Sequence, residues 1–150
     1  METLDIIDDF HGVYRYLSNF WEHPVEFQGV IYPSNEHAFV AAKTTDQTIR
    51  EVIREAKTPG QVKRMGRNLV LRPDWENIKV MVMLDLCKTK FAPGTALASK
   101  LLATGDAFLI EGNTWGDRVW GTVNGEGCNY LGKILMKVRA ELRGERFDIY

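Results

Sequence analysis

The stretch "YPSNEHAFVAAK" (residues 32–43) puts two ionisable side chains, Glu36 and His37, at the start of a predicted helix. Ser34 is a favourable N-cap residue, and the alanines that follow are strong helix formers. Exposed backbone N–H groups and the helix dipole stabilise a carboxylate in the first turn and keep it ionised. This position is typical of a well-capped helix, but it also suits a fixed acid, base or electrostatic catalyst. A lone histidine beside an apolar stripe is more often structural than catalytic, and His37 stays open between the two roles.

The stretch "EGNTWGDRVWGTVNGEGCNYLG" (residues 111–132) is a second candidate for chemistry, because six glycines and three asparagines surround Asp117, Trp115 and Trp120. Glycines allow close backbone approach and positive φ angles. Tryptophan rings offer flat faces on which a purine or pyrimidine can stack. An irregular loop whose tryptophans cover the core is the alternative, although long loops of this composition are often functional. The glycine spacing does not match a dinucleotide-binding fingerprint, since "NGEGCN" lacks the third glycine.

Basic and aromatic residues form two further candidates. The segment "VKRMGRNLVLRPDW" (residues 62–75) clusters basic side chains that can bind phosphate or can form an ordinary solvated surface. They are Lys63, Arg64, Arg67 and Arg72. Trp75, at the end of this segment, is either a core residue or a stacking wall. In "YRYLSNF" (residues 14–20), Asn19 and Phe20 either edge a polar-aromatic pocket or belong to a capped turn.

The elements that must position these residues are mainly helices. Two short strands are predicted as a hairpin around Gln28-Gly29, within residues 24–33. Asp46 and Thr58 are expected to cap the second and third helices. Six helices are predicted: one after Ser34, four over residues 47–56, 60–66, 73–91 and 96–105, and one from about Asn129. The side chain of Asn129 is expected to cap this last helix. Residues 107–111 are predicted as a strand and residues 112–127 as a loop. The fold class is therefore α+β, mainly α-helical, in one compact domain (residues 1–150) with a small antiparallel β element.

The overall composition narrows the function classes. The chain has 150 residues, of which 45% are hydrophobic and 26% charged, as in ordinary globular domains. Its net charge of -1 lacks the basic excess of a general nucleic-acid binder, although a local basic pocket is compatible with it. The N-terminus "METLDIIDDF" has no signal-peptide pattern, and no apolar stretch is long enough to span a bilayer. Cys87 and Cys128 lack the spacing of a zinc site or a disulfide framework, so we expect reduced thiols in a cytoplasmic protein. The three histidines share no helical register, and we expect no metal and no cofactor.

Several motifs in this order resemble the YbiA-like family, also called NADAR after NAD and ADP-ribose. They are "LSNF", "YPSNEHAFVAAK", "MGRN", "RPDWENIK" and "WG...NGEGCNYLG", and the similarity runs from about Tyr14 to Leu142. The resemblance implies a compact, mainly helical fold and an N-glycosidase, which splits the bond between a ribose anomeric carbon and a nitrogen. One branch resembles enzymes that act on phosphorylated ribosylamino-pyrimidine intermediates of riboflavin synthesis. Another branch removes ADP-ribose from guanine in nucleic acid and so reverses a toxin's modification.

The resemblance also implies site residues. The family's functional acid matches Glu36 in "SNEH", although an extra asparagine lies here between the serine and the acid. The family's late aspartate matches Asp117, whose register is left open by the presence of two Trp-Gly pairs. The expected catalytic residues are Glu36, Asp117 and Trp75; the expected substrate-binding residues are Asn19, Phe20, His37, Trp115, Trp120 and Asn129, with Lys43 and Arg67 as phosphate ligands.

The chemistry of an N-glycosidic bond explains these roles. We expect Glu36 and Asp117 to converge beside the sugar C1, where carboxylates stabilise an oxocarbenium-like transition state and activate a water. Trp75 and Trp120 would form walls for the ring of the leaving base. This chemistry needs charge and a water rather than a Lewis acid.

The expected partner is an ADP-ribosyl or phosphoribosyl substrate, and we expect no binding to a membrane. We favour ADP-ribosylated guanine in single-stranded DNA or RNA, as for an antitoxin-like ADP-ribosyl glycohydrolase, because the chain is short and stands alone. Riboflavin intermediates are the alternative. A macrodomain-like hydrolase ranks low, because that fold needs a larger sheet with alternating helices. A sensor of ADP-ribose or a nucleotide would bind without releasing a base, and an interaction module would show no turnover.

Overall fold

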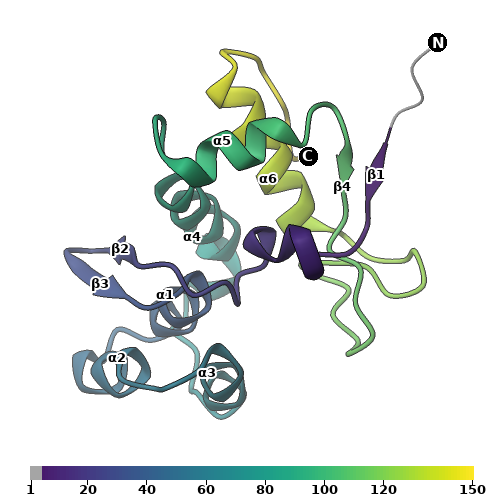
Figure 1. The fold of residues 1–150 in the computed structure, drawn as a ribbon. Coiled ribbons are helices and arrows are strands. Elements are labelled where there is room, and N and C mark those ends of the chain that lie inside the picture. Colours follow the sequence, from purple (N-terminus) through teal and green to yellow (C-terminus); the bar gives the residue numbers. More distant parts are fainter. Residues whose placement is uncertain (1–4) are drawn as a thin grey trace. The chain divides into compact units, whose positions relative to one another are not determined.

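The computed structural model describes residues 5–150, in which helices dominate (Figure 1). The chain divides into two compact units. The first, called the inserted unit here, is residues 19–90, and the second, called the terminal unit, comprises residues 1–18 and 91–150. The expectation of one domain over residues 1–150 stays a prediction.

The inserted unit begins with an antiparallel hairpin of β2 (Val25–Phe27) and β3 (Val30–Tyr32). Gln28 and Gly29 join the strands with φ angles of 51° and 80°. Positive φ at both central residues is what a type I′ turn requires, and this turn matches the twist of the two strands. The predicted hairpin, its turn and the small antiparallel β element are confirmed.

Helix α1 (Asn35–Ala42) is the centre of the inserted unit. It packs against α2 (Gln47–Arg54), α3 (Pro59–Gly66) and α4 (Trp75–Lys90). Seven of its eight residues are buried, and Glu36 alone is partly exposed. A helix that is buried on all sides needs apolar residues all round, which explains why "AFVAA" has no polar face.

The helix starts of the inserted unit follow the predicted capping chemistry. Ser34, Asp46 and Thr58 have extended backbones, and their side chains accept N–H bonds from the first turns of α1, α2 and α3. Gln61 in α3 accepts a reciprocal bond from the backbone N–H of Lys57 at 3.2 Å, one residue before the position expected for a capping box. These three predicted caps are confirmed.

The terminal unit contains two packed helices, α5 (Ala96–Ala103) and α6 (Tyr130–Leu142). It also contains a parallel pair of short strands, β1 (Ile6–Ile7) and β4 (Phe108–Leu109), and α6 packs on β4. A 3₁₀ helix, η1 (Gly12–Leu17), follows β1. The α+β, mainly helical class is confirmed, whereas neither β1 nor η1 was expected from the sequence.

Several predicted boundaries were wrong by one or two residues: α2 ends at Arg54 rather than at residue 56, α3 begins at Pro59 rather than at residue 60, and α5 ends at Ala103 rather than at residue 105. The strand predicted over residues 107–111 is limited to β4, because only Phe108 and Leu109 pair with β1. The long helix begins at Trp75 rather than at Pro73. Asp74 therefore lies before the helix, where its carboxylate accepts two hydrogen bonds from the Arg72 guanidinium.

Asn129 precedes α6 as expected, but its side chain does not cap the helix. Its backbone is left-handed (φ 53°), whereas an N-cap residue needs an extended backbone to aim its side chain at the first turn. The side chain instead accepts a bond from the Glu111 N–H at 3.0 Å and donates one to the Leu109 carbonyl at 2.9 Å. The predicted cap was wrong, and Asn129 ties the start of α6 to the segment after β4.

Glycines in the terminal unit allow backbone segments to touch. A Cβ atom on Gly132, in the first turn of α6, would lie 2.1 Å from the Leu109 carbonyl oxygen. A Cβ atom on Gly121 would lie 2.0 Å from the Glu111 carbonyl oxygen. Real Cβ atoms cannot approach this closely, so both positions require glycine for steric reasons.

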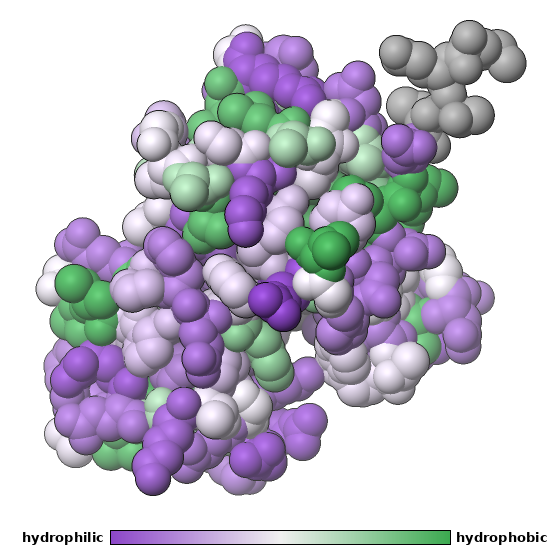
Figure 2. All heavy atoms as spheres, in the orientation of Figure 1, coloured by the Kyte–Doolittle hydropathy of each residue, from purple (hydrophilic) through white to green (hydrophobic). Residues whose placement is uncertain are grey.

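The length of the helices, the surface and the thiols complete the description of the fold. Among residues 5–150, no helix combines the length and apolarity needed to cross a bilayer. Figure 2 shows hydrophilic residues over most of one face, with hydrophobic residues in separate patches. Cys87 is buried and Cys128 is exposed, and both are free cysteines.

The Gly132 contact gives a prediction about stability. Gly132→Ala should lower the free energy of unfolding by at least about 2 kcal/mol, because the methyl group must push the Leu109 carbonyl away. Gly60→Ala in α3 is the control, since its Cβ would meet nothing closer than 3.9 Å and alanine favours a helix. Urea denaturation monitored by circular dichroism measures both, and equal stability of the two variants would contradict the packing argument.

Candidate active site

Glu36 occupies the second position of α1, where backbone N–H groups still lack helical partners. Its own N–H donates to the carbonyl oxygen of Asn19 at 3.1 Å. Asn19 is 9% exposed, and its side-chain amide donates to the Met83 sulfur at 3.4 Å. The structure therefore brings together two predicted site residues, Glu36 and Asn19, and fixes the first turn that carries the carboxylate.

His37 has a structural environment. Its Nε2 lies 2.9 Å from the Ala56 carbonyl oxygen, which can only accept, so this nitrogen is the donor of that bond. Its Nδ1 then accepts from the Ser34 hydroxyl at 2.7 Å, and the same hydroxyl accepts the His37 backbone N–H at 3.2 Å. The ring is 1% exposed. Both ring nitrogens are engaged, which agrees with the structural alternative; the substrate-binding role of His37 stays a prediction.

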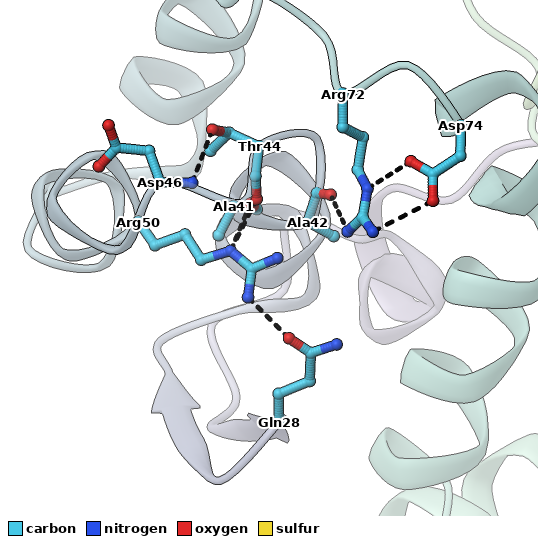
Figure 3. Close-up of polar contacts among 8 residues, drawn as sticks. All are labelled: Gln28, Ala41, Ala42, Thr44, Asp46, Arg50, Arg72 and Asp74. Atoms are coloured by element: carbon cyan, nitrogen blue, oxygen red, sulfur yellow. Dashed lines mark hydrogen bonds and ion pairs between the residues drawn. The ribbon is translucent and has the colours of Figure 1, made fainter.

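Two arginines hold the other end of α1 (Figure 3). The Arg50 Nε donates to the carbonyl oxygens of Ala41 (3.1 Å) and Thr44 (2.8 Å). The Arg72 Nη1 donates to the Ala42 carbonyl at 3.4 Å, while the rest of its guanidinium binds Asp74. Ala41 and Ala42 are the last two residues of a buried helix, and their carbonyl groups have no N–H partner within it; Thr44 lies just after the helix. Arg72, predicted as part of a phosphate-binding cluster, is thus a brace for α1.

Aromatic rings and lysines lie side by side in the inserted unit. The Lys63 ammonium lies 5.8 Å from the centre of the Phe20 ring, and Phe20 is 41% exposed. The Lys43 ammonium lies 5.6 Å from the centre of the Phe39 ring. These distances fall within the range of cation–π contacts. Phe20 and Lys43 were predicted as site residues, whereas Lys63 was noted only as a member of a basic cluster.

Trp75 lies in the core of the inserted unit. It is 4% exposed, and its ring centre lies 5.1 Å from that of Phe39 at an angle of 57°. This packing agrees with the core alternative for Trp75, and its catalytic role stays a prediction. Arg67 follows α3 and is exposed, so its phosphate role stays a prediction as well.

Asp117 belongs to the terminal unit, where local bonds fix it. Its Oδ1 accepts the backbone N–H groups of Val119 (3.0 Å) and Trp120 (2.9 Å). Its own backbone N–H and carbonyl pair with the side chain of Asn113 at 3.0 and 2.8 Å. The Trp120 ring packs edge-on against Tyr130 at 6.2 Å. Since Glu36 belongs to the inserted unit, its convergence with Asp117 stays a prediction.

A cleft of about 410 Å³ lies between the segment after β1 and the glycine-rich loop. Trp115 lines it and is 49% exposed, with its ring edge-on to His11 at 6.4 Å. Trp120, Asp117 and Asn129 do not line this cleft. The structure thus separates the two tryptophans of the loop, and the substrate-binding roles of Trp115, Trp120 and Asn129 stay predictions.

Buried polar groups surround the N-terminal end of α1. The side-chain oxygens of Asn19 and Asn35 are buried without a hydrogen-bond partner among the described residues. The Asn35 amide lies 3.8 Å from the Cys87 sulfur.

Burial raises the pKa of the Cys87 thiol to about 12 and lowers the pKa of Lys90, one turn further along α4, to about 8. Within residues 5–150, no group of three or more His, Cys, Asp and Glu side chains could hold a metal ion.

Comparisons with known proteins place the chain in a family. The model of the NADAR domain matches residues 9–143. The chain belongs to the NADAR family. It is 39% identical to the N-glycosidase YbiA of Shigella boydii over 95% of this chain and 92% of that protein. The riboflavin biosynthesis protein VVA0006 of Vibrio vulnificus is also 39% identical, over 91% of this chain but only 37% of that protein.

A solved structure supports the same conclusion. The NMR structure of Escherichia coli YbiA matches with a TM-score of 0.82 and 37% identity, over 95% of this chain and 88% of that one. The predicted family is confirmed, and this NADAR protein is an N-glycosyl hydrolase. The site residues predicted from the motifs of the family are present at the positions described, but no comparison tests their roles.

The contact between Lys63 and Phe20 was not predicted from the sequence. Lys63 is one of four basic residues in a short segment, and nothing in that segment distinguishes it from Arg64 or Arg67. Its contact is with Phe20, which lies far from it along the chain. Only the pairing of a polar-aromatic segment with a basic segment could have suggested the contact, and neither segment shows it alone.

The Ser34 network gives a prediction about stability. Ser34→Ala should lower the free energy of unfolding by about 2–3 kcal/mol, because it removes the cap and leaves the His37 Nδ1 buried without a partner. Thr95→Ala is the matched control, since Thr95 caps α5 but is exposed, and water can replace its bonds. This control should lose only about 1 kcal/mol. Equal losses in urea denaturation would show that the His37 contact contributes nothing.

The buried Lys90 predicts a pH dependence. Its pKa is lower in the folded chain (about 8) than its ordinary value of 10.5, so the unfolded chain binds more protons between these values. Stability should therefore rise with pH, by about 1 kcal/mol between pH 7.5 and 9. Above pH 9 the rise should stop, because the Cys87 thiol keeps its proton in the folded chain and loses it in the unfolded chain.

Urea denaturation at pH 7.5 and pH 9 measures this effect. Lys90→Met should remove the rise, whereas Lys88→Met, an exposed position on the same helix, should keep it. If the free energy of unfolding changes by the same amount between pH 7.5 and pH 9 in the wild type and in Lys90→Met, Lys90 does not change its protonation on folding.

Proposed function

We propose that Glu36 is the carboxylate that stabilises the ribosyl cation when this enzyme hydrolyses a ribose C1–N bond. The observation that carries this proposal is that Glu36 is the one residue of α1 that is not buried. Because both ends of α1 are held by buried bonds, the carboxylate has a rigid support. A fixed negative charge stabilises a developing cation without reorganisation at the moment of reaction.

The chemistry follows from the bond that breaks. The base leaves with the electron pair of the C1–N bond, and positive charge spreads over C1 and the ring oxygen of the ribose. Glu36 interacts more strongly with this charge than with the neutral ground state, which lowers the barrier. A water then adds to C1 and gives up a proton, while the leaving nitrogen gains one. The products are the free base and a ribose with a hydroxyl group on C1.

Asp117 is proposed as the second carboxylate, which activates the water. Its Oδ1 is held by two backbone N–H groups, so this carboxylate has a fixed orientation within the terminal unit. Trp120, which donates one of these N–H groups, is proposed to stack on the leaving base. These two roles are separate from the role of Glu36.

We propose ADP-ribosylated guanine in single-stranded DNA or RNA as the substrate. Residues 57–71 contain four basic residues and no acidic one: Lys57, Lys63, Arg64 and Arg67. Such a local excess of positive charge suits a ligand with two phosphate groups and a short strand of nucleic acid. The net charge of -1 for the chain limits this attraction to one part of the surface.

A phosphorylated ribosylamino-pyrimidine is the second candidate substrate. The relative from Vibrio vulnificus, which is named a riboflavin biosynthesis protein, favours it. This substrate has one phosphate group and no polynucleotide, so it makes less use of the basic segment. Both substrates share the ribose C1–N bond, and the same carboxylate can act on either.

Incubation with each substrate decides between the two candidates. One reaction contains an oligonucleotide with ADP-ribosylated guanine, and the other contains a ribosylamino-pyrimidine phosphate. Mass spectrometry should detect free ADP-ribose and the unmodified oligonucleotide in the first reaction. If only the second substrate is cleaved, the substrate of this enzyme is the ribosylamino-pyrimidine phosphate and not ADP-ribosylated guanine. Tight binding of ADP-ribose without any cleavage would point to a sensor instead.

Glu36→Gln should lower kcat on the cleaved substrate by about a hundredfold or more, because the amide lacks the negative charge that stabilises the cation. The far-ultraviolet circular dichroism spectrum should not change, since glutamine has nearly the same shape. Glu76→Gln is the matched control, as Glu76 is also in the first turn of a helix but is exposed. Wild-type turnover by a folded Glu36→Gln variant would remove Glu36 from the mechanism.

A further inference from the structure

The end of α6 changes the direction of the chain. Gly144 has a φ angle of 73°, a conformation that favours glycine. Its N–H donates to the Glu141 carbonyl at 3.0 Å, and the N–H of Glu145 donates to the Ala140 carbonyl at 2.8 Å. This pair of bonds is a Schellman motif, which ends a helix in a turn. Residues 145–150, called the return segment here, follow this turn.

The return segment runs along α6 in the opposite direction (Figure 1). The Lys137 ammonium donates to the carbonyl oxygen of Phe147 at 3.1 Å. The Tyr150 ring lies edge-on to the Tyr130 ring, with 6.0 Å between the two ring centres. Three extended residues reach about 10 Å, and seven helical residues rise by about the same length. A nearly extended segment therefore makes both contacts and brings Tyr150 to the first residue of α6.

Three aromatic rings form a row in the terminal unit. Trp120 of the glycine-rich loop lies edge-on to Tyr130 at 6.2 Å, and Tyr130 in turn contacts Tyr150. Edge-on pairs are a favourable geometry for aromatic side chains. Tyr150 is 87% exposed, so its contact with Tyr130 leaves most of its surface accessible. These three residues, called the aromatic row here, begin at the tryptophan proposed to stack on the leaving base and end in an exposed ring.

Two lysines lie next to the aromatic row on the accessible face of α6. Eight of the thirteen residues of α6 are buried, whereas Tyr130, Lys133 and Lys137 are partly exposed and recur every three or four residues. The Lys133 ammonium lies 5.7 Å from the centre of the Tyr130 ring. Lys137 is paired with Glu141 at 3.4 Å, but none of the ion pairs within residues 5–150 involves Lys133. Lys133 thus places a positive charge beside the aromatic row.

We infer that the aromatic row and Lys133 bind a nucleotide that neighbours the modified base in a single strand of nucleic acid. The base of this neighbour stacks on Tyr150, and its phosphate binds Lys133. This inference rests on the proposed function, in which Trp120 stacks on the leaving base, and it specifies how the rest of the strand is bound. Proteins that bind single strands combine aromatic rings with positive charge, because every base has a flat face and every nucleotide has a phosphate.

The charged surroundings of Tyr150 favour a nucleotide over an apolar partner. Arg146 and Asp148 of the return segment are exposed, and Lys133 and Lys137 lie along α6. An apolar surface that covered Tyr150 would have to remove water from these charged groups without binding them, which is unfavourable. A nucleotide offers a flat ring to Tyr150 and an anionic group to Lys133, so it uses both features of this surface.

Fluorescence anisotropy of the full chain with a labelled, unmodified single-stranded oligonucleotide tests this binding without any cleavage. Tyr150→Ala should weaken the affinity about fivefold or more, because one stacked base is lost. Tyr150→Phe keeps a flat ring and should stay within about twofold of the wild type. Phe108→Ala is the matched control and should bind like the wild type, since Phe108 is an exposed aromatic residue of the same unit outside the aromatic row. Unchanged affinity in Tyr150→Ala would overturn the inference, as would a wild type that does not bind the oligonucleotide.

Lys133→Met tests the phosphate contact in the same assay. Loss of one contact should lower the slope of log affinity against log salt concentration by about 0.7, as expected for a single strand. Lys100→Met is the matched control, because the Lys100 ammonium also lies over a tyrosine ring, 5.4 Å from the centre of Tyr16, but outside the aromatic row. This control should keep the slope of the wild type. An unchanged slope in Lys133→Met would overturn the phosphate contact.

The kinetic counterpart compares two substrates of the proposed reaction. One is the oligonucleotide with ADP-ribosylated guanine, and the other is ADP-ribosylated guanosine, which has no neighbouring nucleotide. Tyr150→Ala should lower kcat/KM about fivefold on the oligonucleotide, through KM, and by less than about twofold on the nucleoside. Equal losses on both substrates would overturn the inference, because they would show that Tyr150 acts through Trp120 on the leaving base. If the wild type cleaves neither substrate, the proposed function fails, and the anisotropy measurement still decides whether the aromatic row binds a single strand.

Discussion

The burial of α1 is the constraint on which the rest of the inserted unit depends. A helix inside a protein cannot leave its terminal N–H and carbonyl groups to water, so other parts of the chain must bind them. Ser34 and the Asn19 carbonyl do so at the first turn, and Arg50 and Arg72 do so at the last. Each partner comes from a different segment of the chain. The segments before and after α1 are therefore fixed in place by the same bonds that fix Glu36.

The terminal unit solves a different problem, which is to fix a long loop that lies outside its helices and strands. Its glycines let backbone atoms approach closely, as Gly132 does at the Leu109 carbonyl. Backbone–backbone bonds join parts of the loop, and asparagine side chains add further bonds: Asn129 joins α6 to the segment after β4, and Asn113 pairs with the backbone of Asp117. Asn113 is buried, so these bonds are shielded from water. A loop built in this way can present a carboxylate as rigidly as a helix start can.

Local chemistry explains what the sequence could predict. The caps at Ser34, Asp46 and Thr58 and the Gln28-Gly29 turn depend on residues close together in the chain, and all are confirmed. The parallel pairing of β1 with β4 could not be predicted, because two-residue strands carry no periodicity and the partners lie far apart in sequence. The role of Asn129 could not be predicted either, because asparagine is a favourable N-cap residue and its left-handed backbone is not evident from the sequence.

The candidate site shows the same division between local and distant information. Glu36 could be predicted as a fixed carboxylate, since its position in a capped helix is written in consecutive residues. The brace formed by Arg72 could not, because an arginine next to other arginines gives no sign that it binds the carbonyl groups of α1. Lys63 was hidden for the same reason. In each case the missing information was which element packs against which.

The buried amide groups next to Glu36 are the clearest departure from ordinary core packing. Asn19 and Asn35 each direct an amide N–H group at a sulfur atom, a weak acceptor, and their side-chain oxygens are buried without a hydrogen-bond partner among the described residues. A buried polar atom in this state costs about 1–3 kcal/mol, and apolar residues of similar size would avoid the cost. Such groups are rare in cores and need a reason in each case. Both lie in the segments that meet at the Glu36 N–H, one as its hydrogen-bond partner and one as its neighbour in sequence. This part of the core therefore gives up stability where it supports the carboxylate, and the bonds of Arg50, Arg72 and His37 to backbone carbonyl groups in the same unit offset the loss.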